Sequence, residues 1–170
     1  YKIVNWIWEN VKDLDINSVL DAFGGTGSVS YLFKTKGKQV FYNDNLNFNY
    51  LIGLALIEND GALISEDEIN FLLKKHKAVK YDSFIADTFK DIYYTNEENA
   101  WLDMVIGNIQ HVNNNYKKAL AYFALFQSCI IKRPYNLFHR KNLYIRIADV
   151  KRGFGNKTSW DKAFECYFRK

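Results

Sequence analysis

Hydrophobic and polar positions in the first quarter of the chain follow a strand, helix, strand order. A short apolar run ends at Asp21, a glycine-rich turn follows, and residues 28–36 have the spacing of an amphipathic helix. A second apolar run, residues 40–42, ends in Asn43 and Asp44. This pattern predicts the strand–turn–helix–strand unit that opens a doubly wound α/β sheet, with a ligand at the carboxyl ends of its strands.

Most of the remaining chain up to residue 131 has helical periodicity. The predicted helices cover residues 1–11, 48–57, 66–75, 97–112 and 115–131. Residues 65–68 have a capping-box sequence that starts one of them, and residues 79–85 are a candidate third strand. This block of helices is larger than one crossover of a compact α/β sheet requires, and it therefore predicts a helical insertion.

The composition is that of an ordinary globular protein. The 170 residues are 48% hydrophobic and 25% charged, which suits a single domain. No apolar run approaches the roughly 18 residues that span a membrane, and no signal-peptide pattern is present. We therefore expect a cytoplasmic protein without membrane contact. Cys129 and Cys166 lack metal-ligand spacing, so reduced thiols and no metal site are expected.

The charge of the chain changes abruptly near residue 131. Residues 1–131 carry 12 Lys and Arg against 16 Asp and Glu, a net charge of −4. Residues 132–170 carry 11 against 3, a net charge of +8, with aromatic residues between the basic ones. This pattern is typical of a surface that contacts nucleic-acid phosphates. A solvated basic face is the alternative.

The glycine turn at residues 24–27 narrows the class of ligand. A dinucleotide fingerprint needs a third glycine, and a P-loop needs Lys followed by Ser or Thr; Ser28 and Val29 fit neither. S-adenosylmethionine has no phosphate: Asp21 could accept from its ammonium, and the glycine backbone could approach its methionine part. Asp44 lies 23 residues after Asp21, close to the spacing of an acid that binds ribose hydroxyls. Glycines that serve only the bend are the alternative.

Residues 21–30, Asp-Ala-Phe-Gly-Gly-Thr-Gly-Ser-Val-Ser, resemble the cofactor motif of the Dam-like, alpha-class (D12-type) adenine-specific DNA methyltransferases. The resemblance implies an α/β, Rossmann-like sheet that binds S-adenosylmethionine at residues 1–60, a helical insertion at 61–131 and a basic target-recognition segment at 132–170. The implied cofactor-binding residues are Asp21, Ala22, Phe23, Gly24, Gly25, Thr26, Gly27, Ser28, Asn43 and Asp44.

Two elements of the basic segment extend the resemblance. Residues 138–143 are similar to the family's Arg-x-Asn element, and residues 154–157 to the turn that follows it; in the family both form a hairpin on DNA. The resemblance implies duplex DNA as the partner. With the basic pair that precedes these elements, the expected DNA-binding residues are Lys132, Arg133, Arg140, Asn142, Asn156 and Lys157. The basic side chains would meet phosphates, while the asparagines could also hydrogen-bond base edges.

The family's catalytic Asp-Pro-Pro-Tyr is not present in this sequence, whose single proline is Pro134 in Arg-Pro-Tyr. In the family that motif accepts a hydrogen bond from the adenine amine and stacks on the flipped base. We therefore expect an incomplete fragment, cut at both ends, of a restriction–modification methyltransferase. It should have no catalytic residue and no methyl transfer of its own. The expected protein partner is the rest of the methyltransferase or a cognate restriction enzyme.

Two other function classes fit parts of the sequence. A non-catalytic DNA-recognition subunit, or one half of a split methyltransferase, would hold DNA while another chain supplies Asp-Pro-Pro-Tyr. Residues 149–151, Asp-Val-Lys, match part of a restriction-nuclease site, but no Pro-Asp pair completes that site. A nuclease would also leave the glycine turn unexplained. A reading frame that continues into (Asp/Asn)-Pro-Pro-(Tyr/Phe) would favour the enzyme.

Overall fold

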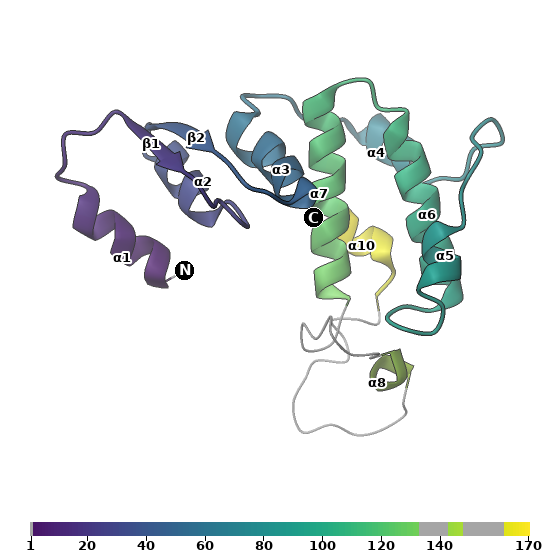
Figure 1. Cartoon of the computed structure of the whole chain (residues 1–170). Helices are drawn as coiled ribbons and strands as arrows, with labels where there is room; N and C mark the ends of the chain where they lie inside the picture. The colour runs from purple at the N-terminus through teal and green to yellow at the C-terminus, as the bar shows by residue number, and fades with distance from the viewer. Residues whose placement is uncertain (1, 133–142, 148–161) are drawn as a thin grey trace. The chain divides into compact units, whose positions relative to one another are not determined.

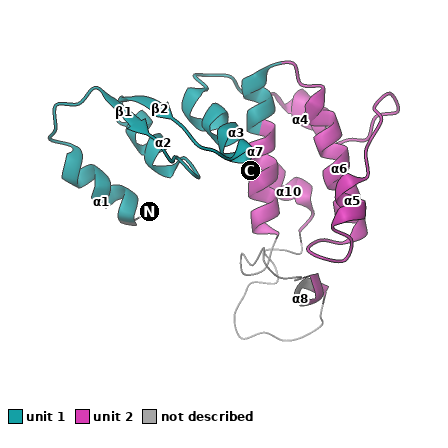
Figure 2. Ribbon diagram, in the orientation of Figure 1, with its two compact units in different colours: residues 1–63, 114–120 teal, residues 64–113, 121–170 magenta. Residues whose placement is uncertain are grey.

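The computed structural model describes residues 2–132, 143–147 and 162–170 (Figure 1). The chain divides into two compact units, which are described separately below. Unit 1 contains residues 1–63 and 114–120, and unit 2 contains residues 64–113 and 121–170 (Figure 2). Among the described residues, the secondary structure is a set of helices and one small parallel sheet.

Unit 1 contains the predicted strand–turn–helix–strand sequence. Its elements are α1 (Lys2–Val11), β1 (Ser18–Asp21), α2 (Ser28–Thr35), β2 (Gln39–Tyr42), α3 (Asn47–Gly53), the π-helix η1 (Leu54–Glu58) and the first turns of α7 (Asn115–Ile131). The two strands pair in parallel, with Ser18 opposite Gln39 and Asp21 opposite Tyr42. The predictions for residues 19–21, 28–36 and 40–42 are therefore confirmed to within a residue or two.

The two faces of this sheet differ in exposure. Leu20 and Phe41 are register partners on one face, and they are 68% and 53% exposed. Asp21 and Tyr42 lie on the opposite face, which is partly buried. Helix α2 contacts both strands and buries Phe33. Because side chains alternate along a strand, the acid at the end of β1 and the tyrosine at the end of β2 share the packed face.

Helix α3 continues without a break into the π-helix η1, as the apolar pattern of residues 48–57 predicts apart from the change in helix type. The carboxyl end of η1 is capped by Lys34 of α2, whose Nζ donates to the carbonyls of Leu56 (3.2 Å) and Asn59 (2.6 Å). A cation at this end of a helix offsets the partial negative charge of its last carbonyls. This contact fixes α3 and η1 relative to α2 within unit 1.

Unit 2 is helical. Its elements are α4 (Glu66–Leu72), α5 (Phe84–Thr88), α6 (Asn96–Gln110), the rest of α7, α8 (Leu143–Ile147) and α10 (Phe164–Phe168). Ser65 and Thr95 each form a complete capping box with the glutamate three residues later, which explains where α4 and α6 begin. Helix α4 ends at Leu72, three residues before the predicted end.

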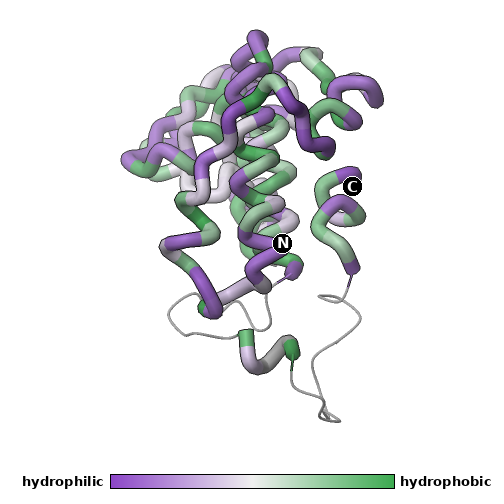
Figure 3. The backbone as a smooth tube through the Cα atoms, turned by 90° about the vertical axis from the view of Figure 1, so that its right-hand side faces the viewer, coloured by the Kyte–Doolittle hydropathy of each residue, from purple (hydrophilic) through white to green (hydrophobic). Residues whose placement is uncertain are grey.

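The core of unit 2 lies between α4, α6, α7 and α10. Leu72, Val105 and Ile109 are fully buried, and the Phe164 ring packs edge-on against Tyr94 at 5.1 Å between centroids. Hydrophobic and hydrophilic residues are interspersed along the described chain (Figure 3). No helix in the described parts of the chain is long and apolar enough to cross a membrane.

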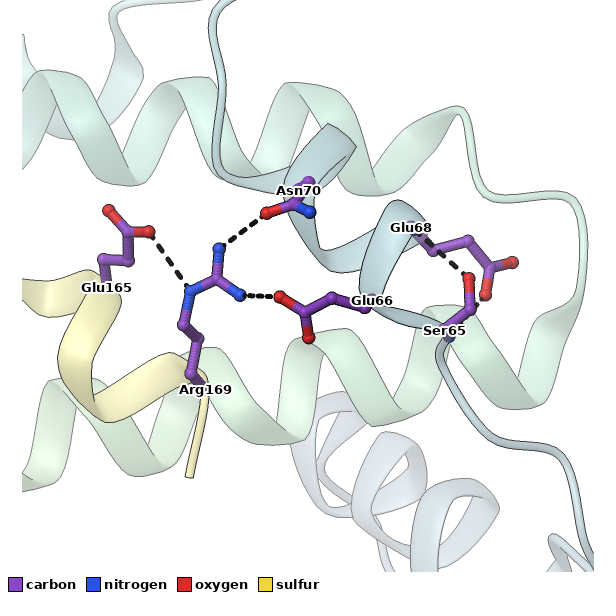
Figure 4. A network of polar contacts seen from close by, with 6 residues as sticks. All are labelled: Ser65, Glu66, Glu68, Asn70, Glu165 and Arg169. Atoms are coloured by element: carbon purple, nitrogen blue, oxygen red, sulfur yellow. Dashed lines mark hydrogen bonds and ion pairs between the residues drawn. The ribbon is translucent and has the colours of Figure 1, made fainter.

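Helix α10 is joined to α4 by Arg169, as Figure 4 shows. The guanidinium of Arg169, the residue after α10, pairs with Glu66 and donates to Asn70 Oδ1 at 2.8 Å. It also donates to Glu165 Oε1 of α10 at 3.1 Å. These contacts are exposed, so each contributes little alone. Together they link the end of α10 to α4.

The prediction of a third strand at residues 79–85 is wrong. Residues 84–88 form α5, because the buried carboxylate of Asp103 accepts hydrogen bonds from the backbone N–H groups of Ile85 and Ala86, both at 2.9 Å. Asp103 thus supplies the partners that a neighbouring strand would otherwise have provided. The sheet therefore has two strands among the described residues.

Candidate functional site

The segment that follows β2 is hydrogen-bonded to the turn that follows β1. Asn43 N–H donates to the carbonyl of Asp21, and Gly24 N–H donates to the carbonyl of Asn43, both at 2.9 Å. The Asn43 side chain adds a bond from Nδ2 to the Ala22 carbonyl at 2.9 Å. These three bonds extend the pairing of the parallel strands by one more step. They bring the two predicted cofactor segments together at the carboxyl end of the sheet.

The side chain of Asp44 also links the segment after β2 to the glycine turn. Its Oδ2 accepts from Gly25 N–H and its Oδ1 from Leu46 N–H, both at 2.9 Å. Hydrogen bonds from Leu46, the Asn49 side chain and Gly25 hold the pKa of Asp44 below its usual range. A carboxylate has about four acceptor positions, and the backbone donors of Gly25 and Leu46 use one on each oxygen. Asp44 is thus an ionised clamp on the glycine turn.

Asp21 is held by helix α2. Its Oδ2 accepts from the hydroxyl of Ser30 at 2.6 Å, and Ser30 is fully buried in the first turns of that helix. Among the contacts of the described residues, no hydrogen bond reaches the other carboxylate oxygen, Oδ1. The Asp21 side chain is therefore oriented by one oxygen, and the second can accept from a cationic group of a ligand.

The three glycines of the turn serve two different purposes. Gly25 and Gly27 have φ values of 52° and 72°, in the left-handed region that favours glycine. Gly24 has ordinary φ, but a Cβ placed there would lie 2.1 Å from Cε2 of Tyr42. A Cβ at Gly25 would meet only the Phe23 carbonyl, at 3.9 Å. The open side of the turn is therefore at Gly25, whereas the missing side chain of Gly24 makes room for Tyr42.

Tyr42 is the residue of this site that sequence reasoning left without a role. Its ring lies against Gly24 and Gly53, where added Cβ atoms would come within 2.1 and 2.6 Å of it. Its hydroxyl lies 2.6 Å from the Gly25 carbonyl and 3.1 Å from the Asn49 carbonyl, and it can donate to either. Burial, and then the charges of the two nearby aspartates, raise the pKa of Tyr42 to about 12. The hydroxyl therefore remains a donor at neutral pH.

The remaining predicted cofactor residues line the rim of the turn. Phe23 is 92% exposed, which is unusual for a phenylalanine beside a strand end. The hydroxyls of Thr26 and Ser28 are 3.0 Å apart on the exposed side, and Gly27 precedes the first residue of α2. The N-terminus of α2 therefore begins inside the turn. No group of three or more metal-ligating side chains is found within the described ranges.

Of the six predicted DNA-binding residues, only Lys132 lies in the described part of the chain. Arg133, Arg140, Asn142, Asn156 and Lys157 lie outside the described residues. Lys132 is 2% exposed; its Nζ pairs with Glu98 at 2.5 Å, donates to the Lys162 carbonyl at 2.7 Å and lies 5.0 Å from the centre of the Phe164 ring. A buried ammonium with these partners is a core contact of unit 2, so its charge is already compensated inside the protein.

Replacing Tyr42 with phenylalanine tests whether its hydroxyl holds the turn. The ring and its packing against glycine remain, and the hydrogen bond to the Gly25 carbonyl is lost. We expect a loss of about 1 kcal/mol in the free energy of unfolding, measured by urea denaturation. Tyr31→Phe is the matched control, because Tyr31 is 49% exposed on α2. An equal change in both variants would contradict the role of the Tyr42 hydroxyl.

Comparison with known proteins places these residues in a wider context. The family model for D12 class N6 adenine-specific DNA methyltransferases matches residues 1–165. The chain is 34% identical over 173 residues to the type II methyltransferase M2.HphI of Haemophilus parahaemolyticus, covering 99% of this chain and 50% of that protein. It is 29% identical over 113 residues to the type II methyltransferase M.FokI of Planomicrobium okeanokoites, covering 58% and 17%. No solved structure matches.

The lengths of the two alignments show how much of these relatives the sequence represents. The chain spans about half the length of M2.HphI and a smaller share of M.FokI. The match to the family model begins at residue 1, so the glycine turn, the helical block and most of the basic segment all lie within it.

Proposed function

Because the chain belongs to the D12 class of N6 adenine-specific DNA methyltransferases, we propose that residues 21–28, 43 and 44 bind S-adenosylmethionine. The single observation that carries this proposal is the set of hydrogen bonds between the Asn43–Asp44 segment and the glycine turn. They place an ionised acid and an oriented acid at the carboxyl end of the sheet. Such an end of a parallel sheet is where α/β proteins bind ligands.

Each part of the cofactor has a group of this chain that suits it. The open oxygen of Asp21 would accept from the methionine ammonium, and the open side of Gly25 would lie along the methionine chain. An oxygen of Asp44, each of which holds one backbone donor at 2.9 Å, would also accept from one ribose hydroxyl. The cofactor supplies the sulfonium-bound methyl group. This chain binds and orients the cofactor, while the acceptor for the adenine amine comes from an Asp-Pro-Pro-Tyr outside these residues.

We assign the parts of the chain accordingly. Residues 1–60 would form the front part of the S-adenosylmethionine-binding domain. Their two-stranded sheet, with α2, would be the beginning of a larger Rossmann-like sheet. The helices of residues 61–131 would be an insertion, and the segment 132–170 would contact the DNA target. The whole protein would methylate N6 of adenine at a specific site, as part of a restriction–modification system. The protein partner of this chain would be the rest of the methyltransferase or a cognate restriction enzyme in the same system.

Calorimetric titration of this chain tests the cofactor proposal. S-adenosylmethionine and its demethylated product should both bind, because they share the amino acid and the adenosine. ATP should bind much more weakly, because its triphosphate finds no P-loop in the turn. NMR shifts on titration should include the amides of Gly25 and Asp44. Shifts elsewhere without changes at these two amides would contradict the site.

Substitutions in the basic segment test the DNA proposal. Replacing Arg140 or Lys157 with alanine should weaken binding to every duplex similarly and lower the slope of log affinity against log salt by roughly one unit each. Replacing Asn142 or Asn156 should affect the preferred site more than random DNA if either reads a base. The measurement is fluorescence anisotropy with labelled duplexes at several salt concentrations. An affinity that does not depend on salt would contradict phosphate contacts.

A DNA-recognition subunit, or half of a split methyltransferase, is the second candidate function. The observation in its favour is the single proline, which leaves these residues without the catalytic motif. The two candidates share the cofactor and DNA tests and differ in where Asp-Pro-Pro-Tyr is encoded. Finding that motif downstream in the same reading frame would support the single-chain enzyme.

A further inference from the structure

A compact group of lysines lies in unit 2, far along the chain from the basic segment. The loop between α4 and α5 contains Lys74, Lys75, Lys77 and Lys80, and all four are exposed. Residues 69–81 contain no acidic residue. Residues 1–131 have a net charge of −4, so this loop is a local reversal of charge. We call residues 74–80 the lysine loop.

One buried side chain forms hydrogen bonds to the backbone at the start of the lysine loop. Asn108 of α6 is fully buried, and its Nδ2 lies within 2.8–3.3 Å of the carbonyls of Phe71, Leu72 and Lys74. A buried amide that makes several hydrogen bonds is costly to rearrange. The first turn of the loop therefore has a fixed path away from the end of α4.

Tyr81 anchors the other end of the loop. Its hydroxyl donates to Oδ1 of Asn108 at 2.8 Å and accepts from His76 N–H at 2.8 Å. Its ring packs on Gly107, where a Cβ would lie 2.8 Å from it. The His76 ring stacks on Phe71 with centroids 4.2 Å apart. Both ends of the lysine loop are thus tied to α6 and to the end of α4.

The lack of acidic partners for these lysines in the described part of the chain favours a ligand outside the chain. Lys75 lies 5.9 Å from the centre of the Tyr81 ring. Within the described residues, Lys74, Lys77 and Lys80 form no ion pair. A flexible loop would lose conformational entropy on binding, whereas a loop already fixed by Asn108 and Tyr81 loses less. A rigid loop with several uncompensated lysines suits an extended polyanion.

We propose that the lysine loop is a second phosphate-contacting surface, which binds the backbone of the same duplex DNA as the basic segment. This inference rests on the proposed function for the identity of the polyanion. Its contacts would be independent of sequence, because lysine ammonium groups meet phosphates as point charges. The loop would add affinity and fix the position of the duplex, while base recognition would remain with the basic segment.

The test compares two variants of the 170-residue chain with the same change in charge. Lys77→Gln/Lys80→Gln removes two loop lysines, and Lys36→Gln/Lys90→Gln removes two exposed lysines elsewhere. Anisotropy with a labelled 20-base-pair duplex is measured over a range of salt. The loop variant should bind about tenfold more weakly, with a salt slope smaller by roughly two units. The control should change by less than about twofold.

A third variant separates the fixed shape of the loop from its charge. Tyr81→Phe keeps all four lysines but removes the bonds to Asn108 and His76. It should weaken DNA binding by a few fold and leave the salt slope unchanged, because the slope reflects the number of phosphate contacts. Thermal denaturation of each variant shows that the fold persists. Equal affinity of Tyr81→Phe and wild type would contradict preorganisation of the loop.

The outcomes distinguish this inference from the proposed function. If both lysine pairs weaken binding equally, net charge alone explains the effect, and the lysine loop is not a DNA surface. If wild type binds S-adenosylmethionine but no duplex, the proposal for the lysine loop is wrong, whereas the proposal for the cofactor site is supported. Preferential binding to vesicles of anionic lipid over duplex DNA would also overturn the inference. If wild type binds neither S-adenosylmethionine nor duplex DNA, the proposed function itself is overturned.

Discussion

Replacing Asp44 with alanine should weaken the binding of S-adenosylmethionine by at least about tenfold. The substitution removes the proposed acceptor for the ribose hydroxyl. It also releases Gly25 N–H and Leu46 N–H, which the carboxylate holds at 2.9 Å. The ligand would then lose one hydrogen bond and would have to order the turn as it binds. Calorimetric titration of both proteins measures the difference.

Asp60→Ala is the control for this substitution, because Asp60 is an exposed aspartate in the same unit. It should leave the cofactor affinity unchanged. Asp44→Asn keeps an acceptor oxygen but places an amide nitrogen near a backbone donor, so its affinity should fall between those of wild type and Asp44→Ala. Unchanged binding by Asp44→Ala would remove Asp44 from the cofactor site.

The lowered pKa of Asp44 also makes the stability of the folded chain depend on pH. The folded state stabilises the ionised Asp44 carboxylate, because Leu46, Asn49 and Gly25 donate hydrogen bonds to it. This contribution to stability is complete above the usual pKa of an aspartate and is lost as the pH falls through the lowered value. Wild type should therefore lose stability in that acidic range. Asp44→Ala should lack this part of the loss, measured by denaturation at several pH values.

The strands, the turn and the capped helices could be predicted from sequence because their determinants are local. A capping box joins residues three apart, as in Ser65 and Glu68, and both are visible in one short window. The glycine turn has its special φ values at Gly25 and Gly27, where glycine is the residue that fits best. Hydrophobic spacing sets the helices in the same way.

The features that sequence reasoning missed depend on residues far apart in the chain. Asp103 starts α5 from a position 18 residues after Ile85, so an apolar stretch that resembles a strand becomes a helix. Gly53 is needed because of Tyr42, although nothing near Gly53 in the sequence indicates this. Lys132 looks like part of a basic surface, and its burial depends on Glu98. Such pairings are decided by tertiary packing, which overrides local pattern.

The predicted cofactor residues come together for a reason that is partly visible in the sequence. Parallel strands end at the same edge of a sheet, so Asp21 and Asn43 had to be neighbours once both strands were recognised. The hydrogen bonds that place Asp44 on Gly25 could not be predicted, because they depend on the φ of the turn and on the start of α3. The sequence therefore indicates which residues lie together at this edge of the sheet, and packing determines how their oxygens are used.

Residues 1–170 by themselves should not transfer a methyl group to DNA, even where they bind both cofactor and duplex. The exocyclic amine of adenine is a poor nucleophile because its lone pair is delocalised into the ring. Transfer needs acceptors that hold its hydrogens and an aromatic face for the flipped base. Within this sequence the single proline excludes Asp-Pro-Pro-Tyr. Asp21 and Asp44 are engaged with Ser30 and the glycine turn.

The measurement is incorporation of labelled methyl from S-adenosylmethionine into a duplex pool of mixed sequence. The expected result is no incorporation above a control without protein. A version of the protein that includes Asp-Pro-Pro-Tyr should be active in the same assay, and its Asp44→Ala variant should lose activity. That pair of results would place cofactor binding in these residues and catalysis beyond them. Labelled N6-methyladenine formed by residues 1–170 alone would show that the chain contains an acceptor for the adenine amine, and that the catalytic role does not depend on Asp-Pro-Pro-Tyr.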